Sequence, residues 1–305
     1  MASRIAFTVL VTFLCSVIFA CSASSLQETK TGEYVIWAHS DIHPRNHEQK
    51  WEYEAAIDDI ISLGLSPDMA VVPGDLVYRQ ESQMYWDWMK NLREKTGIKH
   101  WFEIAGNHDL NDEASYYKNS GKPMHYAVRL GNVLFIFLSD EIRSAITDIS
   151  DEAVKWWERL VIDNQDSIIV TVTHACYAFS GFTAAINWTM VIKNSARFHD
   201  VLKRCHVDLW LSGHTHLPAY FGNKAIISEE YGTLFLDVSS IKKHIASPVE
   251  SWLLILENGS STLRCYPRNH EKKKFYNSIA FTYELSHAFR RGSGAPEIVS
   301  IFQNP

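Results

Sequence analysis

Side chains that bind metal ions recur in five short clusters along this 305-residue chain. In chain order the clusters are Asp41-Ile42-His43, Gly74-Asp75, Gly106-Asn107-His108-Asp109, His174 and Ser212-Gly213-His214-Thr215-His216. They combine carboxylate oxygen, amide oxygen and imidazole nitrogen, and none of them contains cysteine. Such a mixed set suits Zn, Mn, Fe or Ni better than Ca or Mg. The clusters therefore predict a transition-metal site.

The number of donor side chains indicates more than one ion. Besides His108, the clusters supply seven candidate ligands: Asp41, His43, Asp75, Asn107, His174, His214 and His216. Seven ligands are too many for one tetrahedral ion, but they fit two ions about 3.5–4 Å apart that share a carboxylate, as in two-metal hydrolytic sites. We therefore expect a dinuclear centre of divalent or trivalent ions, with Mn, Fe and Zn as the candidates.

Each cluster follows a short apolar run that is typical of a buried strand. The runs span residues 34–38, 69–72, 101–105, 168–173 and 207–211. In an open α/β sheet, residues just beyond the carboxyl ends of parallel strands converge on one crevice. The sequence therefore predicts that the five clusters meet in space.

The remaining elements indicate an α/β fold. Apolar residues at helical spacing predict helices over 48–63, 81–95 and 151–162, and Gly131-Asn132 predicts a hairpin turn between strands 125–130 and 133–139. The runs 224–228, 233–239, 252–256 and 262–266 indicate an antiparallel second sheet, and segment 275–289 fits helix or strand. We expect a four-layer αββα sandwich of two mixed sheets flanked by helices.

In content, order and spacing, the five clusters resemble the motifs of the calcineurin-like metallophosphoesterases. A lone Asp-x-His would be uninformative, whereas five clusters in family order are specific. The resemblance covers residues 34–240. It implies a metal-dependent phosphoric ester hydrolase, a phosphatase or phosphodiesterase, that cleaves small-molecule phosphate mono- or diesters with a metal-bridging hydroxide.

The resemblance also implies a role for each matching residue. One metal would be held by Asp41, His43 and His216, and the other by Asn107, His174 and His214, with Asp75 bridging the two. His108 resembles the histidine that contacts the substrate phosphate and protonates the leaving oxygen.

Loops beside the clusters are candidate substrate contacts. Arg45 follows the first motif and would meet an anionic substrate, although a solvated loop arginine is an equal alternative. Tyr116 in the predicted loop 111–122 and Tyr177 in segment 176–193 could stack on an organic leaving group. Packing aromatics are the alternative reading of both tyrosines.

Tyr78 is an alternative ligand for the metal that Asp41, His43 and His216 would hold. The spacing Gly74-Asp75-x-x-Tyr78 resembles the purple acid phosphatases, in which that tyrosine binds ferric iron, but those enzymes have glycine where this chain has His43. We expect histidine ligation and keep a purple-acid-phosphatase-like acid phosphatase as the alternative. A metal-binding, non-catalytic surface protein is another alternative. The fact that every ligand position is filled argues against it.

The first residues predict an exported protein. Residues 1–23 have the basic start, apolar run and small residues of a signal peptide, 24–32 reads as a linker, and 33–305 forms the phosphoesterase domain. An uncleaved membrane anchor and a lipid anchor at Cys21 are the alternatives, so the protein is expected to be secreted, periplasmic or attached to the cell surface.

The charge of the chain argues against nucleic acid as a partner, and its cysteine content limits the disulfides that can form. The formal net charge of −6, with basic and acidic residues spread evenly, offers no basic face for nucleic acid, and none is expected as a partner. Removal of the signal leaves Cys176, Cys205 and Cys265, an odd count that allows at most one disulfide. The partner that the resemblance implies is a small phosphate ester, with membrane contact expected only through the signal segment or a lipid anchor.

Overall fold

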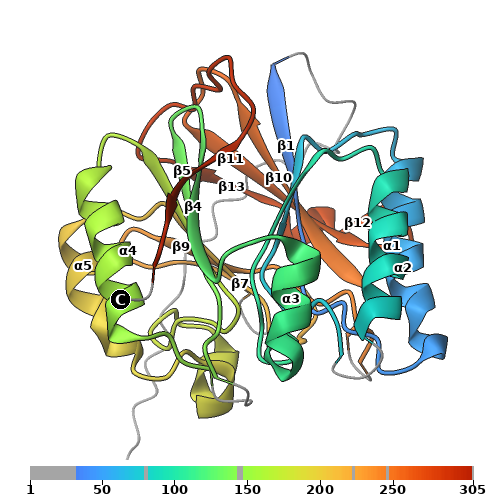
Figure 1. Ribbon diagram of the computed structural model, residues 1–305. Helices are drawn as coiled ribbons and strands as arrows, with labels where there is room; N and C mark the ends of the chain where they lie inside the picture. The colour runs from blue at the N-terminus through green and yellow to red at the C-terminus, as the bar shows by residue number, and fades with distance from the viewer. Residues whose placement is uncertain (1–31, 79–81, 143–146, 222–223, 245–246, 304–305) are drawn as a thin grey trace, which may run out of the picture.

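The computed structural model describes residues 32–78, 82–142, 147–221, 224–244 and 247–303, and in them two β-sheets are stacked with helices on both outer sides (Figure 1). The first sheet has the spatial order β12 (Lys274–Phe275), β11 (Thr262–Asn269), β10 (Glu250–Glu257), β1 (Glu33–Ala38), β2 (Met69–Val72) and β3 (His100–Glu103), and β13 (Phe281–Glu284) also pairs with β11. The second has the order β14 (Glu297–Ile301), β4 (His125–Leu130), β5 (Val133–Leu138), β6 (Ile168–Thr173), β7 (Leu209–Ser212), β9 (Leu234–Asp237) and β8 (Ala225–Ile227).

Helices cover the outer face of each sheet. The α-helices of the described chain are α1 (Lys50–Ser62), α2 (Ser82–Lys95), α3 (Glu113–Ser120), α4 (Asp151–Asp163) and α5 (His199–Arg204). In Figure 1, α1 and α2 lie on one side of the sheet pair, and α4 and α5 lie on the other. The predicted four-layer αββα architecture is confirmed.

The alternation of side chains along the strands explains the layers. Tyr34, Ile36 and Ala38 of β1 point into the apolar core between the two sheets, whereas Val35 and Trp37 point into a second core beneath α1 and α2. A strand with apolar residues on both faces must be covered on both faces. A third core lies between the second sheet and α4, where Trp157 is fully buried.

Parallel pairing brings the five clusters to one end of the molecule. β1, β2 and β3 are parallel neighbours, and so are β5, β6, β7 and β9. Four clusters therefore follow the carboxyl ends of β1, β2, β6 and β7, and the third follows β3 after a short extension at 104–105.

Several sequence predictions need correction. The late runs do not build a separate antiparallel sheet: β8 and β9 extend the second sheet, whereas β10 and β11 pair antiparallel in the first sheet, beside β1. The predicted loop 111–122 overlaps the 3₁₀ helix Asp109–Asp112 and contains α3. The Asp112 side chain caps the start of α3 by accepting a hydrogen bond from Ser115 N, and Gly121 ends the helix in the left-handed conformation. Segment 275–289, left open above, contributes a short 3₁₀ helix and β13.

The three cysteines of the expected mature chain, Cys176, Cys205 and Cys265, are free thiols. The predicted signal peptide, linker and Cys21 anchor fall almost wholly at residues 1–31, outside the described part of the chain. Among the helices that are described, none combines the length and the apolar character needed to cross a bilayer.

Candidate metal centre

Strained backbone holds several candidate ligands at the strand ends. Asp41, Asp75, His214 and His216 have φ values of 55°, 56°, 66° and 50°, in the left-handed region that non-glycine residues rarely adopt. Such residues cost about 1–3 kcal/mol each and persist where the surroundings fix them, commonly at functional sites. Here Ile42 N donates to Asp75 O at 2.8 Å and Asp41 N donates to Gly74 O at 3.2 Å, so the first two motif loops hold each other.

Glycines are required where the motif loops touch. A Cβ on Gly106 would lie 2.3 Å from Asp75 Oδ1, and a Cβ on Gly74, whose φ is +85°, would lie 2.8 Å from His174 Nδ1. No real side chain tolerates such contacts. The glycines of the second and third motifs therefore let the Asp75 carboxylate approach the neighbouring loop.

One group of candidate ligands surrounds Asp41 and Asp75. Asp41, His43, Asp75 and His216 offer donor atoms that all lie within 4.8 Å of one another. His216 Nε2 lies 2.8 Å from Asp41 Oδ1, and His43 Nε2 lies 3.6 Å from Asp75 Oδ2. The first three side chains are almost fully buried, and His216 is half-buried.

A second group shares Asp75 with the first. Asp75, His174 and His214 also bring donor atoms within 4.8 Å of one another. His174 Nε2 lies 3.3 Å from Asp75 Oδ2, 3.1 Å from His214 Nδ1 and 3.1 Å from Asn107 Oδ1. Six of the seven residues named from the sequence thus lie in two overlapping groups with Asp75 in common, and the seventh, Asn107, contacts His174 of the second group.

Hydrogen bonds to backbone carbonyls orient both rings of the second group. His174 Nδ1 lies 2.7 Å from Pro73 O, and His214 Nε2 lies 2.9 Å from Thr189 O. A carbonyl oxygen only accepts, so each of these ring nitrogens carries the proton. This leaves the other nitrogen of each ring on the side of Asp75, the arrangement typical of metal-binding histidines.

Unpartnered atoms show that the first group fits a cation. His43 Nε2, Asp75 Oδ2 and His216 Nδ1 are buried and accept or donate no hydrogen bond within the described chain. Burial holds the pKa of His43 well below its usual value, which keeps the ring neutral. Burial acts the other way on Asp75, but the neighbouring imidazoles, first that of His174, hold its pKa well below the usual range. An ionised Asp75 beside the neutral His43 ring matches the form in which these two side chains bind a metal.

Asp109 ties the second and third motifs together. Its carboxylate accepts hydrogen bonds from Gly106 N at 2.9 Å, from Leu76 N at 3.0 Å and from Val77 N at 3.0 Å. Burial raises the pKa of Asp109 to about 7, and the charge of Asp75 acts in the same direction. This residue therefore positions the loops and does not offer a free ligand atom.

His108 lies beside the two groups and is more open to solvent. Its side chain is 27% exposed, its Nε2 lies 3.9 Å from Asp75 Oδ2, and its backbone N donates to Asp75 Oδ1 at 2.9 Å. Its ring stacks on His43 with centroids 4.5 Å apart. The position combines access for a substrate with proximity to the shared carboxylate.

A basic and aromatic rim surrounds the first group, and Lys242 in it was missed by sequence reasoning. Lys242 Nζ lies 3.4 Å from His43 Nδ1, and burial lowers its pKa to about 8, an effect that Arg45 reinforces. The Tyr78 ring lies 5.9 Å from both Lys242 Nζ and the Arg45 guanidinium carbon. The stretch Ile241-Lys242-Lys243-His244 lies outside every motif and looks like a solvated basic loop, so no local signal marked it.

The structure contradicts two predicted substrate contacts. Tyr116 is 1% exposed in the core beneath α1 and α2, and its hydroxyl donates to Glu103 O at 3.3 Å. Tyr177 is fully buried and packs on Tyr231 and Phe235. Both side chains face inwards because each is the part of its segment that anchors it to the sheet, whereas Arg45 is exposed and lies close to the Tyr78 ring.

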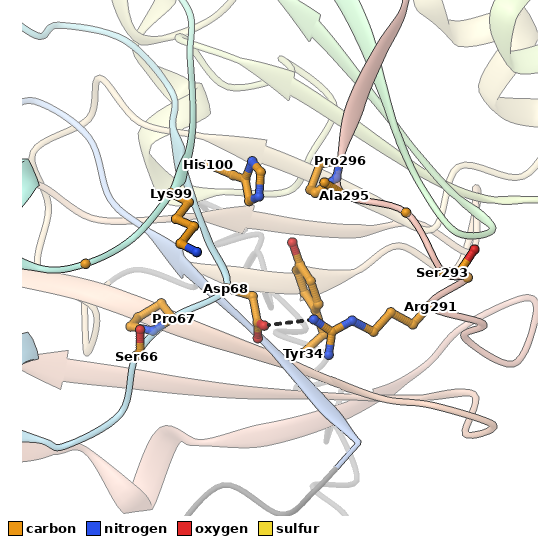
Figure 2. A pocket seen from close by; sticks show the side chains of 13 residues that line it. Tyr34, Ser66, Pro67, Asp68, Lys99, His100, Arg291, Ser293, Ala295 and Pro296 are labelled. Carbon is orange, nitrogen blue, oxygen red and sulfur yellow. Dashed lines mark hydrogen bonds and ion pairs between the residues drawn. The ribbon is translucent and has the colours of Figure 1, made fainter.

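A cavity of about 640 Å³ lies away from this centre, at the amino ends of the strands (Figure 2). It is lined by Tyr34 at the start of β1, Asp68 just before β2, Lys99 and His100 at the start of β3, and the segment from Arg291 to Pro296. Arg291 Nη2 lies 3.3 Å from Asp68 Oδ1, the ion pair drawn in Figure 2. The metal-binding side chains follow the opposite ends of the same strands, so this cavity is not part of the centre.

Comparisons with known proteins agree with the geometry. The family model for calcineurin-like phosphoesterase matches residues 34–218. A dimetal phosphatase from Danio rerio has a similar structure, with 12% identity, a TM-score of 0.63, and coverage of 83% of this chain and 99% of that chain. No curated protein sequence matches.

Two further solved structures share the fold. GAP50, described as the anchor in the inner membrane complex of Plasmodium, has 13% identity, a TM-score of 0.57, and coverage of 85% of this chain and 90% of that chain. Purple acid phosphatase PPD1 from yellow lupin (Lupinus luteus) seeds has 13% identity, a TM-score of 0.60, and coverage of 85% of this chain and 55% of that chain. At these identities, the likeness to all three structures shows the fold alone.

Proposed function

The chain belongs to the calcineurin-like phosphoesterases, which are metal-dependent hydrolases of phosphoric esters, and on that premise we propose that it cleaves phosphate mono- or diesters of small molecules outside the cell. The observation that carries the proposal is the sharing of Asp75 by two groups of metal-binding side chains. Two ions bound there would neutralise the phosphate and lower the pKa of a bound water towards neutrality.

The residues around the centre have separate tasks in this proposal. Asp41, His43 and His216 would hold one ion, Asn107, His174 and His214 would hold the other, and Asp75 would contribute to both. Phosphoryl transfer depends mainly on positioning and on charge stabilisation, which buried, pre-oriented ligands supply. The carbonyls of Pro73 and Thr189 keep two of the rings in place.

Substrate contacts come from the rim. Arg45 is exposed and lies close to the Tyr78 ring, so its guanidinium can meet a phosphate oxygen in the paired geometry that arginine favours. Lys242 adds a second positive charge on the same side. His108, which is partly exposed beside Asp75, donates a proton to the leaving oxygen.

The proposal is tested by turnover after metal reconstitution. Protein loaded with Mn, Fe or Zn is assayed on 4-nitrophenyl phosphate and on bis(4-nitrophenyl) phosphate, with the bound metal counted in the same sample. Two equivalents of metal with turnover of either ester support the proposal. Two equivalents with no turnover of either would favour a non-catalytic metal-binding protein instead.

Export rests on residues 1–23 and needs its own measurement. Expression of the full sequence, followed by cell fractionation and mass determination of the product, is expected to yield protein outside the cytoplasm that lacks the signal. An intact amino terminus would indicate an anchor, and an added acyl mass at Cys21 would indicate a lipoprotein.

A further inference from the structure

Three large apolar side chains are exposed in the segment that follows the ligand His174. Phe179 is 53% exposed, Ile186 is 87% exposed and Trp188 is 64% exposed. Scattered exposed apolar residues are normal, but several in one segment beside a binding site mark a place where a ligand buries them. The same segment was expected to contact the substrate through Tyr177, which instead faces inwards.

Phe179 and Trp188 line a cavity of about 380 Å³. Val191 and Ile192 form its buried wall, Ala178 and Ala196 complete the apolar lining, and the polar lining residues are Lys193, Asn194 and Ser195. The volume lies in the range that accommodates small organic ligands. The Ser195 hydroxyl, which also lines the cavity, already donates to Ile192 O at 2.6 Å and accepts from Ala178 N at 3.2 Å. The cavity therefore suits an apolar group better than a sugar or another polyol.

A direct contact connects this cavity with the metal centre. Thr189 follows Trp188 in the chain, and its carbonyl oxygen lies 2.9 Å from His214 Nε2. Standard backbone dimensions then place the Cα of Trp188 within about 9 Å of that ring nitrogen. The segment that carries Trp188 therefore packs against a metal-binding ring, which places the cavity next to the centre.

The cavity wall is held in shape without a ligand. Cys176 N donates to Met190 O at 3.3 Å and Ile192 N donates to Cys176 O at 3.0 Å, which docks the segment on the chain that leaves β6. Asn187 Oδ1 accepts from Thr189 N at 3.2 Å and from Thr189 Oγ1 at 2.9 Å, which fixes the turn that carries Trp188. A preformed wall lowers the entropy lost on binding.

We propose that this cavity receives the apolar part of the substrate, so that the enzyme prefers phosphate esters that carry an alkyl or aryl group. Trp188 and Phe179 determine this specificity by covering that group while the phosphate lies at the metal centre. The inference rests on the proposed phosphoesterase function, and it names the substrate class of that same site.

The test uses methyl-, butyl- and octylphosphonate with the full-length, metal-loaded protein. Their affinities are measured by isothermal titration calorimetry, and their inhibition constants are measured against whichever 4-nitrophenyl ester is hydrolysed. Affinity is expected to rise about two- to four-fold for each methylene buried, until the cavity is full. Trp188→Ala and Phe179→Ala are expected to lower the gain from methyl to octyl at least ten-fold in combination. Ile162→Ala removes another exposed apolar side chain, from α4, and is expected to keep the gain.

The outcomes separate this inference from the function on which it rests. Turnover of a 4-nitrophenyl ester with affinities that do not depend on chain length would overturn the inference and leave the phosphoesterase intact. A chain-length dependence that both cavity variants retain would overturn it as well. Chain-length-dependent binding that the variants abolish, without turnover of any ester, would support the cavity assignment and overturn the proposed hydrolysis.

Discussion

A single carboxylate has an unusual number of imidazole neighbours in this protein. Within the described chain, Asp75 Oδ2 lies 3.3 Å from His174 Nε2, 3.6 Å from His43 Nε2 and 3.9 Å from His108 Nε2, and it accepts no hydrogen bond. A buried carboxylate oxygen without a donor costs free energy unless a cation is bound to it. Asp75 is therefore the residue whose loss should affect the whole centre.

We predict that Asp75→Asn lowers the bound metal below two equivalents and abolishes turnover. The substitution keeps the shape of the side chain but removes its charge from both ligand groups. Metal content is measured by inductively coupled plasma mass spectrometry on dialysed protein, next to Asp58→Asn, an exposed aspartate of α1 that should keep both ions. Two equivalents and normal turnover in Asp75→Asn would disprove the bridging role.

His108→Ala should have the opposite pattern. We expect near-normal metal content, because the ring lies outside both ligand groups, and a loss of kcat of about 10²–10⁴-fold, the range for removal of a general acid. The loss should shrink for esters of 4-nitrophenol, whose anion leaves without a proton. His47→Ala, an exposed histidine of the first motif loop, is the control. Loss of metal in His108→Ala would make His108 a ligand.

The iron-loaded, oxidised protein should show no visible tyrosinate band. His43 fills the position beside Asp75 with a nitrogen, and the Tyr78 ring stacks against it at a centroid distance of 6.2 Å. The absorption spectrum is recorded for the wild type and for Tyr78→Phe. A purple colour that disappears in Tyr78→Phe would show that the tyrosine binds ferric iron.

At the scale of elements, the sequence pattern predicted those strands, turns and helices that are determined by residues close together in the chain. The runs before Asp41 and Asp75, the hairpin at Gly131-Asn132 and the helix from Asp151 were all found close to their predicted bounds, because alternation, turn residues and helical spacing act over a few residues. The runs that form β10 and β11 were assigned to the wrong sheet because strand type does not encode the partner strand. Helix α3 was missed because its residues, Glu113–Ser120, carry no regular apolar spacing and it is stabilised by Asp112 and by the burial of Tyr116.

The candidate ligands were predictable from their order along the chain, whereas the side chains of the rim were not. Lys242 approaches His43 only because the chain after β9 returns to the first motif, where Lys242 N donates to Asp41 O at 3.0 Å. Such a contact between residues about 200 positions apart leaves no mark in the sequence around either one. The orientation of Tyr177, inwards, and of Trp188, outwards, likewise depends on the finished packing.

A buried ion cluster joins the helix layer to the first sheet and gives a stability prediction. Asp59 of α1 accepts from Arg268 Nε at 2.6 Å and from Arg268 Nη2 at 2.7 Å, and it lies 2.8 Å from His270 Nδ1. Burial opposes ionisation of Asp59, but His270 and Arg268 outweigh it and lower the pKa of Asp59. Asp59→Asn leaves a buried guanidinium unpaired, so the free energy of unfolding should fall by about 3–5 kcal/mol.

Urea unfolding at several pH values checks this prediction. The matched control is Asp58→Asn, which changes the neighbouring, exposed aspartate of α1. A carboxyl with a lowered folded-state pKa adds stability above its unfolded-state pKa, and the stability is lost as pH falls through the folded-state value. The difference between wild type and Asp59→Asn should therefore be full at pH 7 and shrink below about pH 4. Equal stability at pH 7 would show that the cluster contributes nothing.

At the scale of the whole molecule, the centre connects the two sheets. The first sheet supplies Asp41, His43, Asp75 and Asn107 from the loops after β1, β2 and β3, and the second supplies His174, His214 and His216 from the loops after β6 and β7. A direct hydrogen bond already joins loops of the two sheets, since His214 N donates to Asp41 Oδ2 at 3.0 Å. Bound ions would add bonds between the same two layers.

Metal removal should therefore destabilise the entire fold. A ligand that binds only the folded state adds about 2.7 kcal/mol at a concentration 100 times its Kd, so two sites should raise the midpoint of thermal unfolding by several degrees. Differential scanning calorimetry with and without a chelator measures this difference, and hydrogen exchange should show protection lost together at the carboxyl ends of β1 and β6. Asp75→Asn, which cannot bridge the ions, should respond little to the chelator. If chelation demonstrably strips the metal from the wild type and leaves its unfolding midpoint unchanged, the ions do not hold the two sheets together.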